Sequence, residues 1–535
     1  MTVLRRSLVL LVLALAGVVS GVAPAAAANR LDAIRGHGTL VVGVKTEYPP
    51  FGSLDADGNI VGLEADMAAE LARRLHVGLR MVGVTTANRL QKLTDGTIDA
   101  LIATLGDTPQ RRQIVTMVQP DYYASGVNMM APSSRKLAAW TDVQGQTVCS
   151  TQGAYFNRAM SQRYLLDLQL YNGVRDAMLA LRDGRCAGWL YDDTAISEAL
   201  GRPEWKDFAM PLPSLMVVPW AIAIKPGDDG IELNHAIGDT IADWHRTGFL
   251  LDLERKWHLQ PSKYLQDAQA IWMARKADGS YACTRAADGD WPAACQDQVG
   301  QSSAGASALQ KLGMQINEET GLDFSFIYDG YDRISFLRGL MVSVALILCC
   351  VLGTILVAGV GAVAVEARLP LVSPLVRAVT TFCRTTPPLL QLYVVVFGIG
   401  AFTVRWGFTM NAFVAAVACL SLYAGSASML ALTEAAAAIR HRRPDFVITW
   451  RTLPRSFNLA YQPVLASLVN IVKATGMASA VAVPELISSS TAIIAERGNS
   501  ALMVHVLMVV YFILVLAVMQ LIAVLHKRVL RHVTG

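Results

Sequence analysis

Charged residues are scarce in this 535-residue chain: Asp, Glu, Lys and Arg occupy only 16% of its positions, against about 25% in a typical globular protein. Hydrophobic residues make up 53%, which excludes a mainly disordered chain and argues against a wholly soluble enzyme. The net charge of +4 is too small at this length to indicate nucleic-acid binding. The hydrophobicity is uneven, because residues 30–335 have a soluble composition whereas residues 336–528 are typical of a membrane protein.

Several motifs are also missing from the sequence. No Gly-x-x-x-x-Gly-Lys-Ser/Thr loop is present to hold the phosphates of ATP. No Cys-x-x-Cys pair or histidine cluster accompanies the cysteines, so zinc is a weaker explanation for them than disulfides. No Thr-Val-Gly-Tyr-Gly-like selectivity filter is visible. The sequence therefore predicts neither ATP hydrolysis by this chain nor a metal or other cofactor.

The N-terminal residues have the pattern of an export signal. Arg5 and Arg6 precede an apolar run from Leu8 to about Val19, and alanines at 25–28 provide an Ala-x-Ala cleavage site before about Asn29. An uncleaved membrane anchor is the alternative, but the apolar run is short for one. Residues 1–28 are therefore predicted to be a signal peptide, and the residues that follow are expected outside the membrane.

The cysteines of the exported part agree with an oxidising compartment. Their number is even, which is compatible with two disulfides. Cys283 and Cys295 flank a small loop rich in Ala, Asp and Gly and are predicted to pair. Cys149 and Cys186 are the remaining candidates.

Short apolar runs alternate with helical patterns between residues 38 and 262, which predicts an α/β fold. The expected strands are Thr39–Val44, Leu79–Val84, Asp99–Ala103, Gln146–Ser150 and Ala187–Tyr191, and the expected helices are Glu64–Leu75, Ala87–Leu93 and Val174–Leu181. This is too much structure for one unbroken sheet. We therefore expect two lobes, joined by extended crossovers near Ser125–Ala131 and Leu212–Ala223.

Five apolar segments are predicted to cross a bilayer core of about 30 Å. They are Gly339–Val365, Thr385–Val404, Trp406–Thr433, Ser456–Ser490 and Asn499–Leu525. The fourth contains Lys473 and Glu485, which we expect near a helix end or facing the interior. Basic residues gather in alternate loops, at 368–384, 440–455 and 527–531, whereas the opposite loops hold little more than Arg405 and Arg497. The positive-inside rule then places the C-terminus in the cytoplasm.

Five blocks of the exported region resemble the polar amino-acid class of periplasmic solute-binding proteins. The blocks are VVGVKTEYPPFG (41–52), GLEADMAAELARRL (62–75), ANRLQKLTDGTIDALIAT (87–104), DTPQRR (107–112) and GFLLDLERKW (248–257). The resemblance covers nearly the whole region. It implies a two-lobed, type II amino-acid-binding domain over residues 29–262. Lobe 1 is expected at about 38–128 and 212–262, and lobe 2 at about 129–211.

A free amino acid carries a carboxylate and an ammonium group, so its binding cleft needs a forked cation and a carboxylate on rigid elements. Arg111 matches the family's arginine in spacing and is the candidate for the carboxylate; a surface helix arginine is the alternative. The segment before it, with the Thr104 hydroxyl and Gly106, is expected to donate hydrogen bonds to the same carboxylate oxygens of the ligand. Arg112 is expected to face solvent.

Asp192 is the predicted partner of the ammonium group, because it ends an apolar run where a strand would deliver it to the cleft rim. Asp193 is then expected to point elsewhere. A helix N-cap is the alternative role for an Asp at this place. Thr151 and Gly153 resemble the ligand-contacting loop of the second lobe.

The residues predicted to contact the ligand's side chain differ from the family pattern. Tyr48 is expected to pack on the ligand's side chain, and Tyr155 is a further aromatic candidate. Lys45 stands where several members carry an acidic residue, and Thr86 stands near a frequent aromatic position. Lys45 thus favours an acidic or polar ligand, or faces solvent, and the sequence does not say which amino acid is bound.

The membrane region resembles the permease subunit of amino-acid ATP-binding-cassette importers of the histidine/glutamine type. The blocks are FLRGLMVSVALIL (336–348), CRTTPPLLQLYVVVFG (383–398), TEAAAA (433–438), RTLPRSF (451–457) and VKATGMASAVAVPEL (472–486). The resemblance implies an all-α permease domain at 336–528, after a periplasmic linker at 263–335 and before a cytoplasmic tail at 529–535.

In that family a cytoplasmic helix near a Glu-Ala-Ala sequence docks onto the ATPase. Residues Glu434, Ala435 and Ala436 match that motif, although the glycine that usually follows it is missing. The loop 434–457 is therefore the predicted ATPase-coupling segment. The implied partners are an amino acid, a separate ATPase that forms a homodimer and a second permease copy.

The predicted function is that of a receptor fused to a permease, located in the bacterial inner membrane with its binding domain outside. A ligand-gated ion channel of the glutamate-receptor type is the alternative, but there the membrane segments interrupt the binding domain. Here both lobes precede residue 263. An enzyme on the binding-protein fold would need one anchoring span and not five, and no paired catalytic carboxylates stand out.

Overall fold

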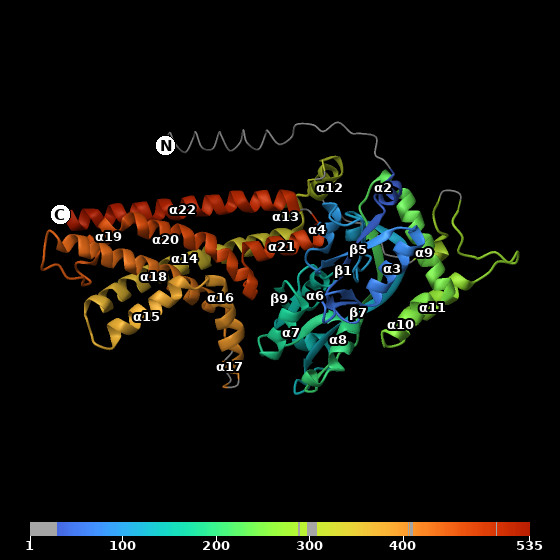
Figure 1. Ribbon diagram of the computed structural model, residues 1–535, viewed down its shortest axis with the longest axis horizontal. Helices are drawn as coiled ribbons and strands as arrows, with labels where there is room; N and C mark the ends of the chain where they lie inside the picture. The colour runs from blue at the N-terminus through green and yellow to red at the C-terminus, as the bar shows by residue number, and fades with distance from the viewer. Residues whose placement is uncertain are drawn as a thin grey trace.

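The computed structural model describes residues 29–286, 289–296, 308–320, 322–404, 406, 410–498 and 500–534. The predicted signal peptide and Arg405 lie outside the described residues. An α/β part occupies one end of the molecule and long helices occupy the other (Figure 1). The predicted fold class, a binding-protein-like α/β domain followed by membrane-capable helices, is confirmed.

The α/β part is built on one large sheet with the strand order β5-β1-β6-β12-β7-β10-β8-β9, and β11 pairs with β7. Its strands are β1 (Thr39–Lys45), β5 (Gly78–Val84), β6 (Ala100–Ile102), β7 (Thr116–Pro132), β8 (Thr147–Thr151), β9 (Asp167–Tyr171), β10 (Trp189–Asp192), β11 (Phe208–Ala209) and β12 (Leu215–Ile224). A small second sheet contains β2 (Glu47–Tyr48), β3 (Gly52–Leu54) and β4 (Ile60–Val61).

Helices cover this sheet. They are α2 (Arg30–His37), α3 (Leu63–Leu75), α4 (Arg89–Thr94), α5 (Pro109–Arg112), α6 (Asn157–Tyr164), α7 (Val174–Arg182), α8 (Asp193–Leu200), α9 (Ile231–Thr247), α10 (Phe249–Lys256) and α11 (Lys263–Met273). Strand β1 runs parallel to both β5 and β6, and its Leu40, Val42 and Val44 are fully buried. A parallel strand covered in this way is apolar along its length, which is why the sequence pattern located it.

Strands β7 and β12 connect two lobes. Lobe 1 contains β5, β1 and β6, and lobe 2 contains β10, β8 and β9. Strand β12 pairs with β6 in lobe 1, whereas β7 pairs with β10 in lobe 2. The two strands pair with each other antiparallel, with a register shift between Trp220 and Ile222 and another between Leu215 and Val218. The predicted extended crossovers fall within or next to these two strands.

The segment after α11 packs on lobe 1. Cys283 is bonded to Cys295, with Cα atoms 5.7 Å apart, and Cys149 to Cys186, with Cα atoms 5.6 Å apart. Buried Trp272 and Trp291 surround the first of these bonds. Among the described residues, no group of three or more His, Cys, Asp or Glu side chains could hold a metal ion. Part of the predicted linker is therefore an ordered extension of lobe 1.

The helical part begins six residues earlier than the predicted permease domain. Its helices are α14 (Gly330–Glu366), α15 (Val372–Thr385), α16 (Pro388–Tyr393), α17 (Gly400–Val404), α18 (Ala412–Arg440), α19 (Leu453–Leu459), α20 (Tyr461–Ala474), α21 (Leu486–Arg497) and α22 (Ser500–Thr534); the short α12 (Ala308–Thr320) and α13 (Ser325–Tyr328) precede them. Four stretches in the described part are long and apolar enough to cross a membrane, or up to five if one bent pair forms a single span.

Two of the predicted spans need correction. The second was expected over 385–404. Its helical part begins at Pro388, after a bend of 111° from Val372–Thr385, and the two stretches make a fifth span only if they cross as one bent pair. Pro387 and Pro388 lie at this break, and proline supplies no backbone N–H to continue a helix. The fourth, expected over 456–490, is a shorter span, Tyr461–Val481, followed by the separate helix α21.

Glu485 explains why the fourth segment divides. It is fully buried and accepts hydrogen bonds from the backbone N–H groups of Ile487 and Ser488, both at 2.9 Å, at the start of α21. Tyr511 donates a further bond to it at 3.0 Å. Glu485 thus faces the interior, which is one of the two expected positions. Lys473 is exposed but lies in the last turn of α20, near a helix end, which is the other expected position.

Candidate functional site

The eight predicted ligand residues converge on the boundary between the lobes. Lobe 1 supplies Lys45, Tyr48, Thr104, Gly106 and Arg111, and lobe 2 supplies Thr151, Gly153 and Asp192. Polar contacts cross the boundary between them: the Tyr48 hydroxyl donates to Asp192 Oδ2 at 3.3 Å and lies 2.9 Å from the Thr194 hydroxyl. The two lobes are therefore closed on each other in this structure.

Arg111 bridges the two lobes directly. Its Nη1 donates to the Gly106 carbonyl and its Nη2 to the Gly153 carbonyl, both at 2.9 Å. The side chain is buried, and no carboxylate lies within 4 Å of it among the described residues. Burial, followed by the charge of Arg89, lowers the pKa of Arg111 to about 9. The guanidinium is a desolvated cation with neutral partners, so it can gain a bound anion.

The neighbouring Arg112 has a different environment. It forms a bidentate pair with Asp107, with distances of 2.7 and 2.6 Å, and its side chain is 38% exposed. This contrast arises from local structure: Thr108 and Pro109 start the short helix α5, and the Thr108 hydroxyl accepts from the Arg111 N–H at 3.3 Å. One turn of helix thus directs adjacent arginines to opposite sides.

Asp192 ends β10 and is buried at the cleft. It precedes α8, but its side chain makes no capping hydrogen bond there, and its Oδ1 has no partner among the described residues. Burial raises the pKa of Asp192 to about 6, against the opposing charges of Lys45 and Arg89. Asp193 instead accepts from the Ser125 hydroxyl at 2.7 Å and from the Gly126 N–H at 3.1 Å, on the crossover strand β7.

Several buried polar atoms in the cleft and directly behind it have no hydrogen-bond partner in the described part of the chain. They are Thr104 Oγ1, Thr151 Oγ1, Asp192 Oδ1, Glu64 Oε2 and Arg89 Nε. Each buried polar atom without a hydrogen-bond partner costs about 1–3 kcal/mol. Several such atoms from both lobes meet at this boundary, which favours a polar molecule bound there. With Arg111 as the cation and Asp192 as the anion, the arrangement can hold a small molecule that carries both a carboxylate and an ammonium group.

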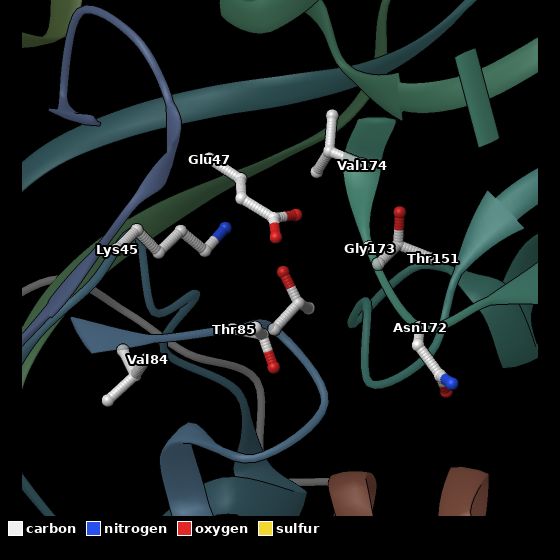
Figure 2. A pocket seen from close by; sticks show the side chains of 9 residues that line it. Lys45, Glu47, Val84, Thr85, Thr151, Asn172, Gly173 and Val174 are labelled. Atoms are coloured by element: carbon white, nitrogen blue, oxygen red, sulfur yellow. The ribbon is translucent and has the colours of Figure 1, made fainter. Parts of the chain in front are cut away.

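Lys45 lies at the end of β1, inside the cleft. Its Nζ is 3.2 Å from the Tyr191 hydroxyl and 4.5 Å from the centre of the Tyr48 ring. Figure 2 shows the Lys45 and Glu47 side chains directed into a small hollow, with Thr151 and Gly173 on its other side. Burial, followed by the charge of Arg89, lowers the pKa of Lys45 to about 7. The alternative that Lys45 faces solvent is wrong.

We expect Lys45→Met to stabilise the folded chain. The Lys45 pKa falls from 10.5 to about 7 on folding, so between these values the unfolded state binds the additional proton. The unfavourable contribution of Lys45 is therefore complete below pH 7 and diminishes as the pH rises toward 10.5. Scanning fluorimetry at pH 7 should show a melting temperature at least about 3 °C higher, since 1 kcal/mol corresponds to about 2–4 °C in a domain of this size.

The same substitution should flatten the rise in melting temperature between pH 7 and pH 9. The matched control is Lys136→Met, at an exposed lysine, which should change neither quantity. A lower melting temperature for Lys45→Met at pH 7 would contradict the assignment.

Sequence reasoning missed the buried charges behind the cleft. Arg89, in the first turn of α4, donates to the Ala103 carbonyl and, at 2.9 Å, to the Thr104 carbonyl. Glu64, in the first turn of α3, accepts from the Thr104 N–H and the Tyr122 hydroxyl. Together they hold Thr104 at a φ of 45°, which is uncommon for a residue other than glycine. A charge in the first turn of a helix is ordinary on a protein surface, so the local pattern did not mark them.

Residues 40–260 match the family described as bacterial extracellular solute-binding proteins, family 3. The lysine/arginine/ornithine-binding periplasmic protein of Escherichia coli K12 is 31% identical over 176 residues, which cover 32% of this chain and 67% of that relative. The L-cystine-binding protein TcyJ of the same strain is 25% identical over 230 residues, 42% of this chain and 85% of the relative. Among solved structures, holo ArgBP from T. maritima aligns over 42% of this chain and 99% of its own, with 25% identity and a TM-score of 0.38. The chain belongs, through its α/β part, to the bacterial extracellular solute-binding proteins of family 3.

Proposed function

We propose that this chain captures an amino acid outside the membrane and translocates it inward, as the fused receptor and permease subunit of an ATP-binding-cassette importer. The observation that carries the proposal is the closed cleft in which buried Arg111 and Asp192 come from different lobes. The names of two relatives, the lysine/arginine/ornithine-binding and L-cystine-binding proteins, support an amino acid as the ligand. The domain limits of 29–262, 263–335 and 336–528 are part of this proposal.

In the proposed complex the ligand carboxylate binds Arg111 and the Thr104 and Thr151 hydroxyls. The ammonium group binds Asp192 Oδ1. Tyr48 and Trp220, whose ring centres are 6.1 Å apart, provide apolar walls for the carbon skeleton. Lys45 lies next to the side-chain position without a carboxylate within 4 Å among the described residues. We therefore expect an acidic or polar side chain rather than a cationic one, because a buried like charge opposes binding.

The long helices supply the proposed translocation path, completed by a second copy of the chain. Glu434, Ala435 and Ala436 belong to the last turns of α18 rather than to a loop, and both alanines are buried. The segment between α18 and α19 instead exposes Val447 and Trp450, with 48% and 60% of their surfaces accessible. This turn, on the basic side predicted to be cytoplasmic, is the proposed docking point for a separate ATPase.

A binding and transport experiment in two stages tests the proposal. The full chain in lipid nanodiscs is titrated calorimetrically with each common L-amino acid, and one or a few should bind. The chain is then reconstituted into proteoliposomes with its co-purifying ATPase, and uptake of the bound amino acid should require ATP. Binding without uptake would reject the permease assignment, and amino-acid-evoked ion currents without an ATPase would favour a channel.

We expect Asp192→Asn to weaken amino-acid binding by about tenfold or more. The ammonium group loses its counter-charge, although the amide oxygen keeps one hydrogen bond. Asp193→Asn is the matched control, because Asp193 bonds to Ser125 and Gly126 of the crossover strand rather than to the cleft. Calorimetry on the full chain compares the two. A larger loss from Asp193→Asn would show that the ligand does not bind at Asp192.

A further inference from the structure

Helix α21 belongs to the helical part of the chain and lies against both lobes. It packs on α4 and α5 of lobe 1, and Figure 1 shows it at the junction of the two parts, beside α4. The carbonyl of its C-cap residue Gly498 accepts a hydrogen bond from the Thr94 hydroxyl of lobe 1 at 3.4 Å. From lobe 2, the Gln152 side chain donates to the Ser488 hydroxyl at 3.4 Å. The proposed ligand loop 151–153 is therefore in direct contact with a helix from outside the α/β part.

Gly153 of this loop is enclosed by lobe 1 and α21. A Cβ atom added to it would lie 2.7 Å from the Thr86 carbonyl oxygen and 2.9 Å from the Ala495 Cβ, so neither neighbour leaves room for a side chain. Gly153 also has a φ of 75°, which is a second, independent reason for glycine at this position. Ala495 itself is buried, with 1% of its surface exposed. Gly153 is thus packed directly against Ala495, and both residues must be small.

The carbonyl of Gly153 orients the proposed ligand cation. It accepts from Arg111 Nη2 at 2.9 Å, and the Gly106 carbonyl accepts from Arg111 Nη1 at the same distance. With one carbonyl on each terminal nitrogen, the plane of the guanidinium is fixed. A forked cation binds both oxygens of a carboxylate only when the two groups are nearly coplanar. A shift of Gly153 would therefore turn the guanidinium away from the plane in which it can bind the ligand's carboxylate.

Ion pairs hold the end of α21 that carries Ala495. Arg497 pairs with Asp329 at 3.2 Å and with Asp332 at 3.1 Å, at the start of α14. Arg158 of lobe 2 pairs with the same Asp329 at 2.9 Å. The Arg497 and Asp332 side chains are largely buried, and separating a buried pair is costly because each charge is left without its partner. A larger side chain at position 495 is therefore expected to displace the Gly153 loop rather than α21.

We propose that Ala495 is a positioning residue of the amino-acid site, which keeps the Gly153 carbonyl on Arg111 and thereby orients the guanidinium for the ligand's carboxylate. This rests on the proposed function, because it requires an anionic group of the ligand on Arg111. The site is then complete only with α21 in place, so the helical part contributes to the affinity of the cleft. The coupling is reciprocal: bound ligand favours the position of α21 against Gly153, and a movement of α21 away from Gly153 weakens binding.

The test measures how strongly the cleft prefers a carboxylate when residue 495 is enlarged. The full chain and its variants in lipid nanodiscs are equilibrated, in separate samples, with the twenty common amino acids and with their α-carboxamides, which keep the ammonium group but lack the carboxylate. Mass spectrometry gives the ratio of bound acid to bound amide. We expect Ala495→Val to lower this ratio by about tenfold, as for the partial loss of a hydrogen-bonded charge pair. A purely structural defect would instead lower acid and amide binding together, and that result would overturn the proposal.

Two control substitutions isolate the contact with Gly153. Ala492→Val adds the same side chain one turn earlier on α21, where Ala492 borders a cavity between lobe 2 and the helical part, and it should leave the ratio unchanged. Ala495→Ser nearly conserves the volume of the side chain and should keep the ratio within about twofold of the parent. Equal losses in Ala492→Val and Ala495→Val would contradict a specific role of Ala495.

The contact of lobe 2 with the helical part is measured separately. Asp167→Cys with Arg338→Cys replaces an ion pair between lobe 2 and α14 whose Arg338 and Asp167 side chains are 63% and 48% exposed, so its loss costs little. A short bismaleimide should cross-link this pair equally in the parent and Ala495→Val backgrounds, with each single cysteine variant as background for the native free cysteines.

An unchanged ratio in Ala495→Val with intact cross-linking would overturn the proposal. Lost cross-linking in that variant would overturn it as well, because the substitution would then act on lobe 2 as a whole and not through Gly153. A parent chain that retains no amino acid would instead overturn the proposed function.

Discussion

Arg111→Ala should abolish amino-acid binding while the α/β part stays folded. The substitution leaves the ligand carboxylate in a buried cleft without its charge partner, which costs roughly 2–5 kcal/mol, or about 30-fold or more in affinity. Folding should tolerate the change, because within the described residues the Arg111 side chain donates to the neutral carbonyls of Gly106 and Gly153 and its burial is itself unfavourable. Calorimetry measures affinity, and scanning fluorimetry measures folding.

Arg112→Ala provides the control for this experiment, since it removes the same type of side chain one residue away. Arg112 pairs with Asp107 outside the cleft, so its loss should leave affinity within about threefold of the parent. Undiminished affinity in Arg111→Ala would remove Arg111 from the site. Equal losses in both variants would indicate that α5 had been disrupted rather than that a ligand contact had been removed.

Trp450→Ala should prevent association with the ATPase and stop uptake, without changing amino-acid binding outside. The turn between α18 and α19 has a fixed shape, because Phe446 and Ile448 are buried and Arg440 donates to the Phe446 carbonyl at 3.0 Å. Trp450 projects from it with 60% of its surface exposed. A tryptophan that becomes buried at an interface commonly contributes 2 kcal/mol or more, so co-purification of the ATPase should fall by about 30-fold or more.

Trp406→Ala is the matched control, since Trp406 is also exposed, with 75% of its surface accessible. It precedes α18, whereas Trp450 follows it, so in the proposed topology the two tryptophans lie on opposite sides of the membrane. ATPase co-purification should be normal in Trp406→Ala. A normal level of co-purified ATPase in Trp450→Ala would exclude this turn as the docking point and leave the other exposed basic loops as candidates.

Local sequence pattern located five strands and three helices of the α/β part, namely β1, β5, β6, β8, β10, α3, α4 and α7. The expected strands over 39–44 and 79–84 and the helix over 64–75 agree with β1, β5 and α3 to within one residue at each end. Strand β1 was predictable because burial against helices on both faces leaves a continuous apolar run in a parallel strand, and α3 was predictable because a helix with one buried face has a regular apolar spacing. The resemblance of short blocks to a family then singled out Arg111, and the end of an apolar run singled out Asp192.

The membrane region was less predictable in detail. Composition indicated apolar segments but did not show that the segment containing Pro387 bends or that Glu485 starts a new helix. A hydrophobic stretch indicates that its side chains are shielded from water, but it does not indicate the direction of the helix axis. That direction depends on local hydrogen bonds: a proline lacks the backbone N–H that would continue a helix, and a buried capping side chain binds the first N–H groups of a new one.

The sequence by itself determined the α/β class and the membrane-capable helices that follow it, and it led to the proposal that Arg111 and Asp192 bind a zwitterion. Only the tertiary structure decided how lobe 1, lobe 2 and α21 meet, which placed Glu64 and Arg89 behind Thr104 and Ala495 against Gly153. The physical reason is that periodicity reports which face of an element is buried but not what covers that face. Gly153 and Ala495 are hundreds of positions apart in the chain, and only folding brings them into contact.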